Sequence, residues 1–426
     1  MSELPMTRAD CEALDTADPL RSFRDRFDLP DGVIYLDGNS LGALPKATAP
    51  RLAEMVGGEW GGELIRGWLS RGWMAAPRAV GAKIARLVGA EADEVLVADT
   101  TAINLFKLLA AAIELNPGRT TVLSDTGNFP TDLYMVQGLG TLLGDRCRLR
   151  VVEPEAVEAA IDDDTAIVML TEIDYRTGRR HDMARGTRAA HAKGALTIWD
   201  LAHSAGAIPV DLNRPLDLDG GRLDGPGADF AVGCGYKYLN GGPGAPAFLY
   251  VARRWQDKVR PALSGWLGHA EPFAFDLDYR PAPGIDRMIC STPSVLAVAA
   301  LDCGVELMAE ADAAARHAKS RALGDLFVGL VERDCAAHGF TLASPRNSTQ
   351  RGSQVSFAHP QGYSIMQALI ARGVIGDFRA PDLIRFGFAP LYNGHADVWD
   401  AVATLRAVME TAAWDRPEWR TRAAVT

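Results

Sequence analysis

The stretch ADFAVGCGYKYLNGGPG, residues 228–244, joins an apolar run to a glycine-rich turn and carries a lysine at the junction. The run Ala228–Gly233 is of the short, continuous kind that is typical of strands covered on both faces. Lys237 follows it with no other basic residue nearby. Lysine is rarely buried unless it is paired or functional, and desolvation lowers the pKa of an amine. We therefore interpret Lys237 as a candidate Schiff-base amine, with an ordinary surface lysine as the alternative.

The three glycines that follow Lys237 in this stretch do not indicate a nucleotide-binding loop. They come after the lysine, they lack the GxGxxG order, and they do not open a helix. No other expected strand is followed by GxGxxG, which disfavours a nicotinamide dehydrogenase. We expect these glycines to let the backbone pass close to a ligand or to another subunit.

Outward from this stretch, short apolar runs alternate with longer helical patterns, which predicts an α/β fold with a mainly parallel sheet. One helical pattern covers residues 101–115, and another begins near Leu133. At 426 residues, the chain is long enough for a large α/β domain and a smaller second one. The strands expected in the large domain cover residues 94–98, 120–124, 165–171, 195–200, 228–233 and 245–252.

The chain after about Leu301 has a mixed pattern that predicts a smaller α+β module. It begins with an alanine-rich helical pattern and ends with an amphipathic helix over residues 395–413. Between them we expect a helix at 364–373 and strands at 352–359, 373–379 and 382–388. The predicted domains are an N-terminal arm that joins the small domain, a large domain that holds the site, and a C-terminal small domain, over residues 1–70, 71–300 and 301–426.

Charge and cysteine usage disfavour several classes of function. Lysine and arginine total 44 against 54 acidic residues, and the net charge of −10 does not attract nucleic acid or an anionic membrane. The six cysteines show no CxxC or CxH spacing, so neither a metal site nor a disulfide framework is expected. No window reaches the roughly 18 apolar residues of a membrane span. We expect a cytoplasmic protein that acts on a small molecule.

Polar residues follow the carboxyl ends of the expected strands, where open parallel sheets bind ligands. Thr100, Thr101 and Ala102 stand where a strand turns into a helix, so their N–H groups can cradle a phosphate, although a threonine there is more often a plain N-cap. Asp200 ends an apolar strand, so it needs a cationic partner such as a protonated heterocycle, or it caps the next turn. His203 lies on the same rim, where a structural histidine is the alternative.

In this order, the features resemble the fold-type I pyridoxal-phosphate enzymes of the aspartate aminotransferase superfamily. Several longer motifs, spread over most of the chain, resemble those of the kynureninase family: YLDGNSLGALP (35–45), NFPTD (128–132), DLAHSAG (200–206), GYKYLNGGPG (235–244), PALSGWLGH (261–269) and RFGFAPLYN (385–393). The resemblance implies a large PLP-transferase-like domain, pyridoxal 5'-phosphate (PLP) as cofactor, and a homodimer with shared active sites. It also implies hydrolysis of L-kynurenine to anthranilate and L-alanine, in the tryptophan catabolism that leads to NAD biosynthesis.

The resemblance assigns roles residue by residue. Lys237 would be the Schiff-base lysine, and Asp200 would hold the pyridinium nitrogen protonated. Tyr236 would bind the cofactor phosphate and is a candidate proton donor. Arg385 would bind the substrate α-carboxylate bidentately, to which a guanidinium is suited. Phe129 would stack on the cofactor ring, and the other expected cofactor residues are Thr101, Ala102, Pro130, Thr131, Asp132, Thr171, His203, Trp266 and Thr292, with Ser291 and Thr292 also at the substrate.

One motif departs from the family pattern, and two further functions are alternatives to the kynureninase interpretation. Animal members read Ser-Asn-Pro-Pro where this chain has STPS, so Thr292 leaves open whether 3-hydroxykynurenine is handled as well as kynurenine. A cysteine desulfurase or a small-substrate aminotransferase is the alternative on the same scaffold, but Cys303 and Cys335 lie in helical patterns that suit a mobile nucleophile poorly. A non-catalytic ligand-binding regulator would not be expected to keep Lys237, Asp200 and Arg385 together. Three tryptophans of the N-terminal segment either close over an aromatic substrate or pack between the arm and the large domain: Trp60, Trp68 and Trp73.

Overall fold

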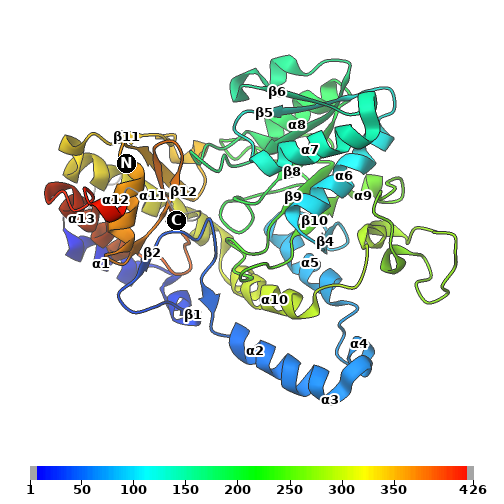
Figure 1. The fold of residues 1–426 in the computed structure, drawn as a ribbon, viewed down its shortest axis with the longest axis horizontal. Helices are drawn as coiled ribbons and strands as arrows, with labels where there is room; N and C mark the ends of the chain where they lie inside the picture. The colour runs from blue at the N-terminus through cyan, green and yellow to red at the C-terminus, as the bar shows by residue number, and fades with distance from the viewer. Residues whose placement is uncertain (1–6, 420–426) are drawn as a thin grey trace.

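The computed structural model describes residues 7–419, and its larger lobe is built on a seven-stranded sheet (Figure 1). The strand order is β4-β10-β9-β8-β7-β5-β6, and all the pairings are parallel except those of β10, which runs antiparallel to both of its neighbours. The strands are β4 (Val95–Val97), β5 (Thr121–Asp125), β6 (Arg148–Val152), β7 (Thr165–Thr171), β8 (Leu196–Asp200), β9 (Phe230–Gly233) and β10 (Phe248–Val251). The mainly parallel α/β sheet predicted from the sequence is confirmed.

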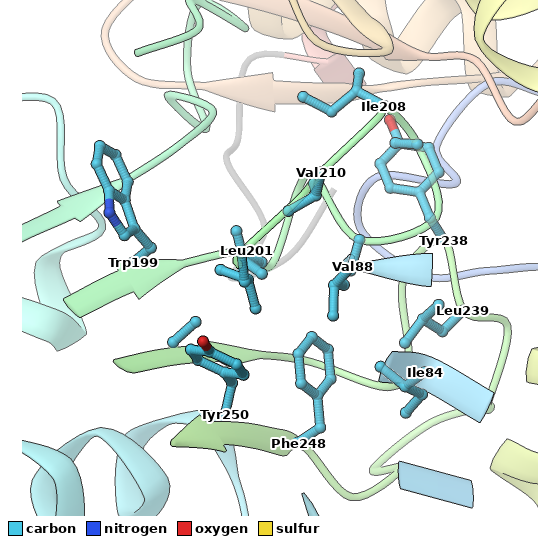
Figure 2. Close-up of a cluster of buried hydrophobic side chains, with 14 of the residues drawn as sticks. Ile84, Val88, Trp199, Leu201, Ile208, Val210, Tyr238, Leu239, Phe248 and Tyr250 are labelled. Carbon is cyan, nitrogen blue, oxygen red and sulfur yellow. The ribbon is translucent and has the colours of Figure 1, made fainter. Parts of the chain in front are cut away.

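Both faces of this sheet are buried because successive side chains along its strands are apolar. In β8, Ile198 joins the core beneath the helices α6 and α7, whereas Trp199 joins the core on the opposite face. Figure 2 shows part of this second core, with Trp199, Tyr250 and Phe248 of the sheet and, beside Phe248, Ile84. Each such side chain contributes roughly 1.5–3 kcal/mol on burial. The helices on the two faces are α5 (Ala76–Leu87), α6 (Thr101–Leu115), α7 (Pro130–Leu143), α8 (Met183–Ala192) and α10 (Val295–Glu310).

The same core anchors the turn that carries Lys237. Tyr238 and Leu239, the next two residues, are buried in it (Figure 2). Asn240 closes the turn, since its N–H donates to the Lys237 carbonyl at 2.9 Å and its φ is +55°. The N-terminal arm contacts the opposite side of this turn at Gly42. A Cβ added to Gly42 would lie 2.4 Å from the Lys237 carbonyl oxygen, so the two backbones are in close contact. The backbone of Lys237 is therefore held between the core and the arm.

The smaller lobe combines the C-terminal part of the chain with the N-terminal arm. Its four-stranded antiparallel sheet has the order β11-β12-β15-β14. In Figure 1 the helix α1 lies beside α13 in this lobe, and β2 of the arm pairs in parallel with β13. These elements are α1 (Arg8–Ala17), β2 (Ile34–Tyr35), α11 (Ala313–Asp334), β11 (Thr341–Leu342), β12 (Gln354–Ala358), α12 (Gly362–Ile370), β13 (Val374–Ile375), β14 (Asp377–Arg379), β15 (Leu383–Gly387) and α13 (His395–Glu410).

The structure differs from the sequence analysis at several elements. The strand β6 was not expected, because Arg148 and Arg150 interrupt its apolar pattern. It lies at the edge of the sheet and pairs only with β5, and an edge strand tolerates charged side chains. The strand expected at 373–379 is two short strands, β13 and β14, in different sheets. The helix α10 spans the expected boundary at residue 300 and packs into the core of the large sheet. The domain limits 1–70, 71–300 and 301–426 remain a prediction.

A bent helical segment links the arm to the large lobe and lies at the bottom of Figure 1. It consists of α2 (Thr48–Glu54), a π-helical turn over Met55–Trp60, α3 (Gly61–Glu63) and α4 (Gly67–Ser70). The remaining short elements include β1 (Phe27–Asp28), β3 (Leu44–Pro45) and α9 (Arg253–Gln256). Across residues 7–419, no helix has the length and the apolar character needed to cross a membrane.

Candidate active site

The carboxyl ends of β8 and β9 bring Lys237, His203 and Asp200 together. The two strands pair in parallel, with Asp200 opposite Val232, so the loops that follow them leave the sheet at the same edge. Nζ of Lys237 lies 3.2 Å from Nε2 of His203. Asp200 is buried, and its Oδ1 accepts a hydrogen bond from the Ala202 N–H at 2.8 Å. The three residues that the sequence analysis singled out at this rim therefore form one site.

Two buried carboxyl groups, those of Asp200 and Asp132, lie at this site. Burial raises the pKa of Asp200, although Lys237 opposes the shift. Burial, and then the nearby Asp200, raise the pKa of Asp132 well above its usual value. Oδ2 of Asp132 has no hydrogen-bond partner among the described residues. A cationic heterocycle that donates an N–H would stabilise these buried acids, so the two carboxyl groups fit a protonated pyridine ring.

His203 is the neutral member of the site. Burial, and then the charge of Lys237, hold its pKa well below the usual value of a histidine. A neutral imidazole has one nitrogen that accepts a hydrogen bond. We infer that Nε2 accepts from the Lys237 ammonium, which orients the amine at the strand end.

The first turn of α6 offers free backbone donors. Thr100 is its N-cap, and Oγ1 of Thr100 accepts from the Ile103 N–H at 3.3 Å. The backbone bonds of the helix begin with Asn104 N–H to Thr100 O at 2.9 Å, so Thr101 and Ala102 precede the first intrahelical donor. Their N–H groups and the positive end of the helix suit a phosphate. Thr101 is thus the first helical residue, and the capping role belongs to Thr100.

An aromatic side chain stands at the start of α7. Phe129 is the N-cap residue and 43% exposed, and its ring meets that of Tyr175 edge-on, with 5.1 Å between centroids. Pro130 and Thr131 form the first turn of α7 beside it. Because Tyr175 contacts Phe129 at an angle of 86°, this contact leaves a ring face of Phe129 available for stacking.

Thr171 and Tyr236 lie close to the central cluster. Thr171 ends β7 opposite Asp200 in the sheet register, and its Oγ1 donates to the Ile173 carbonyl at 3.3 Å. The ring centroid of Tyr236 is 5.7 Å from Nζ of Lys237. Burial raises the pKa of Tyr236, so the phenol keeps its proton at neutral pH. The cofactor roles predicted for Thr171 and Tyr236 stay predictions.

Three predicted residues lie apart from Lys237 in the single chain. Ser291 and Thr292 are exposed and line a cavity of about 300 Å³ with Thr100, and the described lining of this cavity includes neither Lys237 nor Asp200. Trp266 is 40% exposed and packs edge-on against Phe273, with 5.8 Å between ring centroids. The roles predicted for these three residues stay predictions.

Arg385 is placed at the site but is already paired. It lies fully buried on β15, and its Nε donates to Oδ1 of Asp377 at 2.8 Å while its Nη2 donates to Oδ2 of the same carboxylate. Its Nη2 also donates to Oγ of Ser40 at 2.9 Å, and its Nη1 donates to the Tyr175 carbonyl. The guanidinium edge that we expected to bind a substrate carboxylate therefore holds Asp377.

The residues that contact Arg385 or lie beside it were not predicted from the sequence, because they come from distant segments of the chain. Asp37 and Ser40 belong to the N-terminal word YLDGNSLG, whereas Asp377 and Arg379 belong to β14. Ser40 donates to Oδ2 of Asp377 at 2.8 Å, and Nη2 of Arg379 donates to the same oxygen at 2.6 Å. Alternating charges in GDFR were the available signal, because residues two apart on a strand share a face.

Asp37 makes the stability of this cluster depend on pH. Burial, and then Asp377, raise the pKa of Asp37 to about 7, and its Oδ1 has no hydrogen-bond partner among the described residues. The pKa of Asp37 is higher in the folded state than in the unfolded state, where it is about 3.9, so the folded state binds its proton more tightly. The contribution of Asp37 to the free energy of unfolding is therefore fully present below about pH 3.9 and is lost as the pH rises to about 7. The wild type should therefore lose stability relative to Asp37→Asn as the pH rises across this window.

Urea unfolding of both apoproteins at several pH values checks this expectation. The exposed Asp31 supplies a matched control, since Asp31→Asn should leave the pH dependence unchanged. A constant difference between wild type and Asp37→Asn across the window would contradict the raised pKa.

The tryptophans of the N-terminal segment occupy different environments. Trp73 is buried, and its Nε1 donates to Oε2 of Glu59 at 2.9 Å. Trp68 packs edge-on against Trp73, with 5.7 Å between ring centroids, whereas Trp60 is 53% exposed. Packing therefore explains Trp73 without any ligand.

Solved structures with the same architecture are PLP enzymes of low sequence identity. A cysteine desulfurase from Thermococcus onnurineus NA1 matches with a TM-score of 0.73 and 18% identity over 92% of this chain and 98% of that one. A C-DES variant with glycine covalently linked to its PLP cofactor matches with a TM-score of 0.75 and 16% identity over 90% and 98% of the two chains. The chain thus has the fold of the fold-type I PLP enzymes, and the buried acids near Lys237 suit that cofactor.

The sequence comparisons name the family. Residues 317–405 match the model of the kynureninase C-terminal domain. A kynureninase of Burkholderia mallei is 52% identical over 99% of this chain and its own full length, and one of Pseudomonas fluorescens is 49% identical over the same shares. The chain belongs to the kynureninase family, which confirms the resemblance seen in the sequence.

Proposed function

We propose that the protein hydrolyses L-kynurenine to anthranilate and L-alanine with PLP as cofactor. The observation that carries this proposal is the cluster of Lys237, His203, Asp200 and Asp132 in a chain of the kynureninase family. When bound, PLP withdraws electrons from the substrate and so stabilises negative charge at its α and β carbons. The residues proposed to hold PLP are Lys237 covalently, Asp200 at the ring nitrogen, Phe129 on the ring face, and Thr101, Ala102 and Tyr236 at the phosphate.

The proposed proton transfers use three residues of the site. The amine of Lys237 would take the proton from Cα of the substrate. Neutral His203 holds the Lys237 amine through the 3.2 Å contact, which keeps the amine over the substrate. Water adds to the γ-carbonyl of the substrate, and the Cβ–Cγ bond then breaks to release anthranilate. Tyr236, protonated at neutral pH because of its burial, is the proposed donor to the β carbon.

The substrate range, the assembly and the cellular setting are also part of this proposal. Because Thr292 stands where animal family members have an asparagine, 3-hydroxy-L-kynurenine is a second candidate substrate. We propose a cytoplasmic homodimer that serves tryptophan catabolism along the kynurenine pathway toward NAD biosynthesis. Assembly is supported by large apolar side chains on the surface of the chain, which are costly in water and typical of interfaces. They are Leu64, Ile65, Leu69, Phe273, Phe275 and Leu277, with exposed fractions from 63% to 103%. In such a dimer Trp266, Ser291 and Thr292 would complete the site of the partner subunit.

The desulfurase alternative lacks a suitable nucleophile. Cys303 lies within α10, and Cys335 is buried at the end of α11. Burial raises the pKa of Cys335 to about 12 and also raises that of Cys303. A thiol with a raised pKa is a poor nucleophile at neutral pH. Cys303 and Cys335 therefore do not favour a desulfurase activity for this chain.

Incubation of the purified, PLP-loaded protein with L-kynurenine tests the proposal. Anthranilate fluorescence should rise with time, and L-alanine should appear in equal amount. A parallel reaction with 3-hydroxy-L-kynurenine measures the substrate preference through the ratio of the two kcat/KM values. Absence of anthranilate from a protein that binds PLP covalently would contradict the proposal.

A further inference from the structure

A cavity of about 530 Å³ lies where the large lobe meets the small one. Its walls come from the last turn of α5, from the loop after β8, and from the junction of α10 with α11. Ile208 and Val210 of this loop also belong to the core of the large lobe and are labelled in Figure 2. The described lining includes none of Lys237, His203 and Asp200. The cavity is therefore separate from the candidate active site.

A buried arginine with few partners lines this cavity. Arg316 of α11 is 7% exposed, and its Nη1 donates to the Gly206 carbonyl at 2.8 Å. This is the one hydrogen bond that the guanidinium makes within residues 7–419, although it carries five N–H donors. Nε is enclosed by protein atoms and has no partner there, whereas Nη2 is unpartnered without being enclosed. The two hydrogens of Nη2 are therefore the donors that a ligand in the cavity can reach.

The charge of Arg316 has no counter-ion in the described part of the chain. Burial lowers the pKa of its guanidinium, and the nearby Asp312 opposes the shift without forming an ion pair with it. Asp312 is the N-cap of α11, and its Oδ1 accepts from the Ala315 N–H at 2.7 Å. A buried charge without a partner is costly, so an anion in the cavity would stabilise Arg316.

The charges around the cavity suit an anion with a single negative charge. The charged residues of the lining are Arg86, Arg316, Glu310 and Asp312. Glu310 already pairs with Arg26 at 2.9 Å, so three arginines stand against two acids. His317 also lines the cavity and is neutral, because burial lowers its pKa to about 4. The excess of one positive charge matches a carboxylate better than a phosphate, which carries up to two negative charges at neutral pH.

The other walls of the cavity are mostly aliphatic. They include Leu87, Ile208, Val210 and Met308. Ligand sites commonly combine apolar walls with a few polar groups that fix the orientation of the ligand, and a volume of this size holds a small organic molecule. The lining therefore suits an aliphatic body attached to a carboxylate head.

The position of the guanidinium is fixed by the loop that follows β8. Gly206, which accepts the hydrogen bond from Arg316, has a φ of +84°, and a Cβ there would lie 3.0 Å from Cε of Met308. The tight packing at Gly206 holds its carbonyl in place, so Arg316 is oriented before a ligand arrives.

We propose that this cavity is a second ligand-binding site, which takes a small aliphatic monocarboxylate with its carboxylate on Nη2 of Arg316 and its body against the aliphatic walls. The ligand would contact α5 of the large lobe and α11 of the small lobe together. This inference goes beyond the proposed function, since it uses none of the residues assigned to PLP or to L-kynurenine.

Calorimetric titration of the PLP-loaded protein with hexanoate tests the proposal. Wild type should bind hexanoate at least about 10-fold more tightly than hexanamide, which has the same body without the charge. Arg316→Gln should raise the Kd of hexanoate about 10-fold or more, because the charge that pairs with the carboxylate is lost. Arg316→Lys should restore part of the affinity. Arg406→Gln is the matched control, since Arg406 is 48% exposed on α13, and its Kd should equal that of wild type.

A second variant alters the space of the cavity and leaves Arg316 in place. Ala309 is half-buried on α10 and lines the cavity, and leucine is also a good helix former. Ala309→Leu should fill part of the volume and weaken hexanoate binding. A wild-type Kd in either Arg316→Gln or Ala309→Leu would overturn the inference, as would equal binding of hexanamide or tighter binding of inorganic phosphate. Because the titration does not require anthranilate formation, failure of the proposed function would leave this result unaffected.

Discussion

Replacing Lys237 with alanine is expected to lower the rate of anthranilate formation by roughly 10³-fold or more, because one change removes both the covalent attachment and the proton-transfer group. The turn around Lys237 is anchored by Tyr238 and Leu239, which stay in place, so the variant should fold. The measurements are kcat on L-kynurenine and the visible absorbance of the covalent lysine–cofactor adduct, which the variant should lack.

The exposed Lys193 provides the matched control for this prediction. Lys193→Ala should keep both the rate and the absorbance of wild type. Retention of either property by Lys237→Ala, in protein that still unfolds cooperatively, would show that another group performs the chemistry and would remove the central residue from the proposal.

The change Asp200→Asn should separate activity from stability. The asparagine keeps an oxygen that can accept from the Ala202 N–H but loses the charge that opposes the ring nitrogen of the cofactor. We expect kcat to fall by roughly 10²- to 10³-fold, the size of effect that follows loss of one preorganised electrostatic group. Because burial raises the pKa of Asp200, its charged form is disfavoured by folding, and the apoprotein of the variant should be at least as stable at neutral pH.

Two measurements check the separation: kcat on L-kynurenine, and the free energy of unfolding of the apoprotein in urea. Asp163→Asn alters an exposed acid at the surface and should change neither value. A variant Asp200→Asn with wild-type kcat would show that the cofactor nitrogen needs no carboxylate here. A large loss of apoprotein stability would instead indicate that Asp200 is mainly a structural group.

Much of the large domain could be predicted because its strands are local apolar runs. The run 165–171 is β7 to the residue, and the expected helix 101–115 is α6. Strand ends in a parallel sheet meet at one edge, so Asp200, His203 and Lys237 could be placed together from sequence order alone. β6 escaped prediction because an edge strand with half-exposed arginines has no continuous apolar pattern.

The amino-acid sequence by itself determined the α/β class, the family and the lysine-centred cluster, because each depends on local patterning and on residues that directly follow a strand. Only the tertiary structure decided how the small-lobe arginines are paired. Ser40 and Asp377 are 337 residues apart in the chain, yet they share a hydrogen bond beside Arg379 and Arg385. Contacts between such distant segments depend on how the arm and the C-terminal sheet pack. No local periodicity records that packing, so the pairing of Arg385 with Asp377 emerged only from the folded chain.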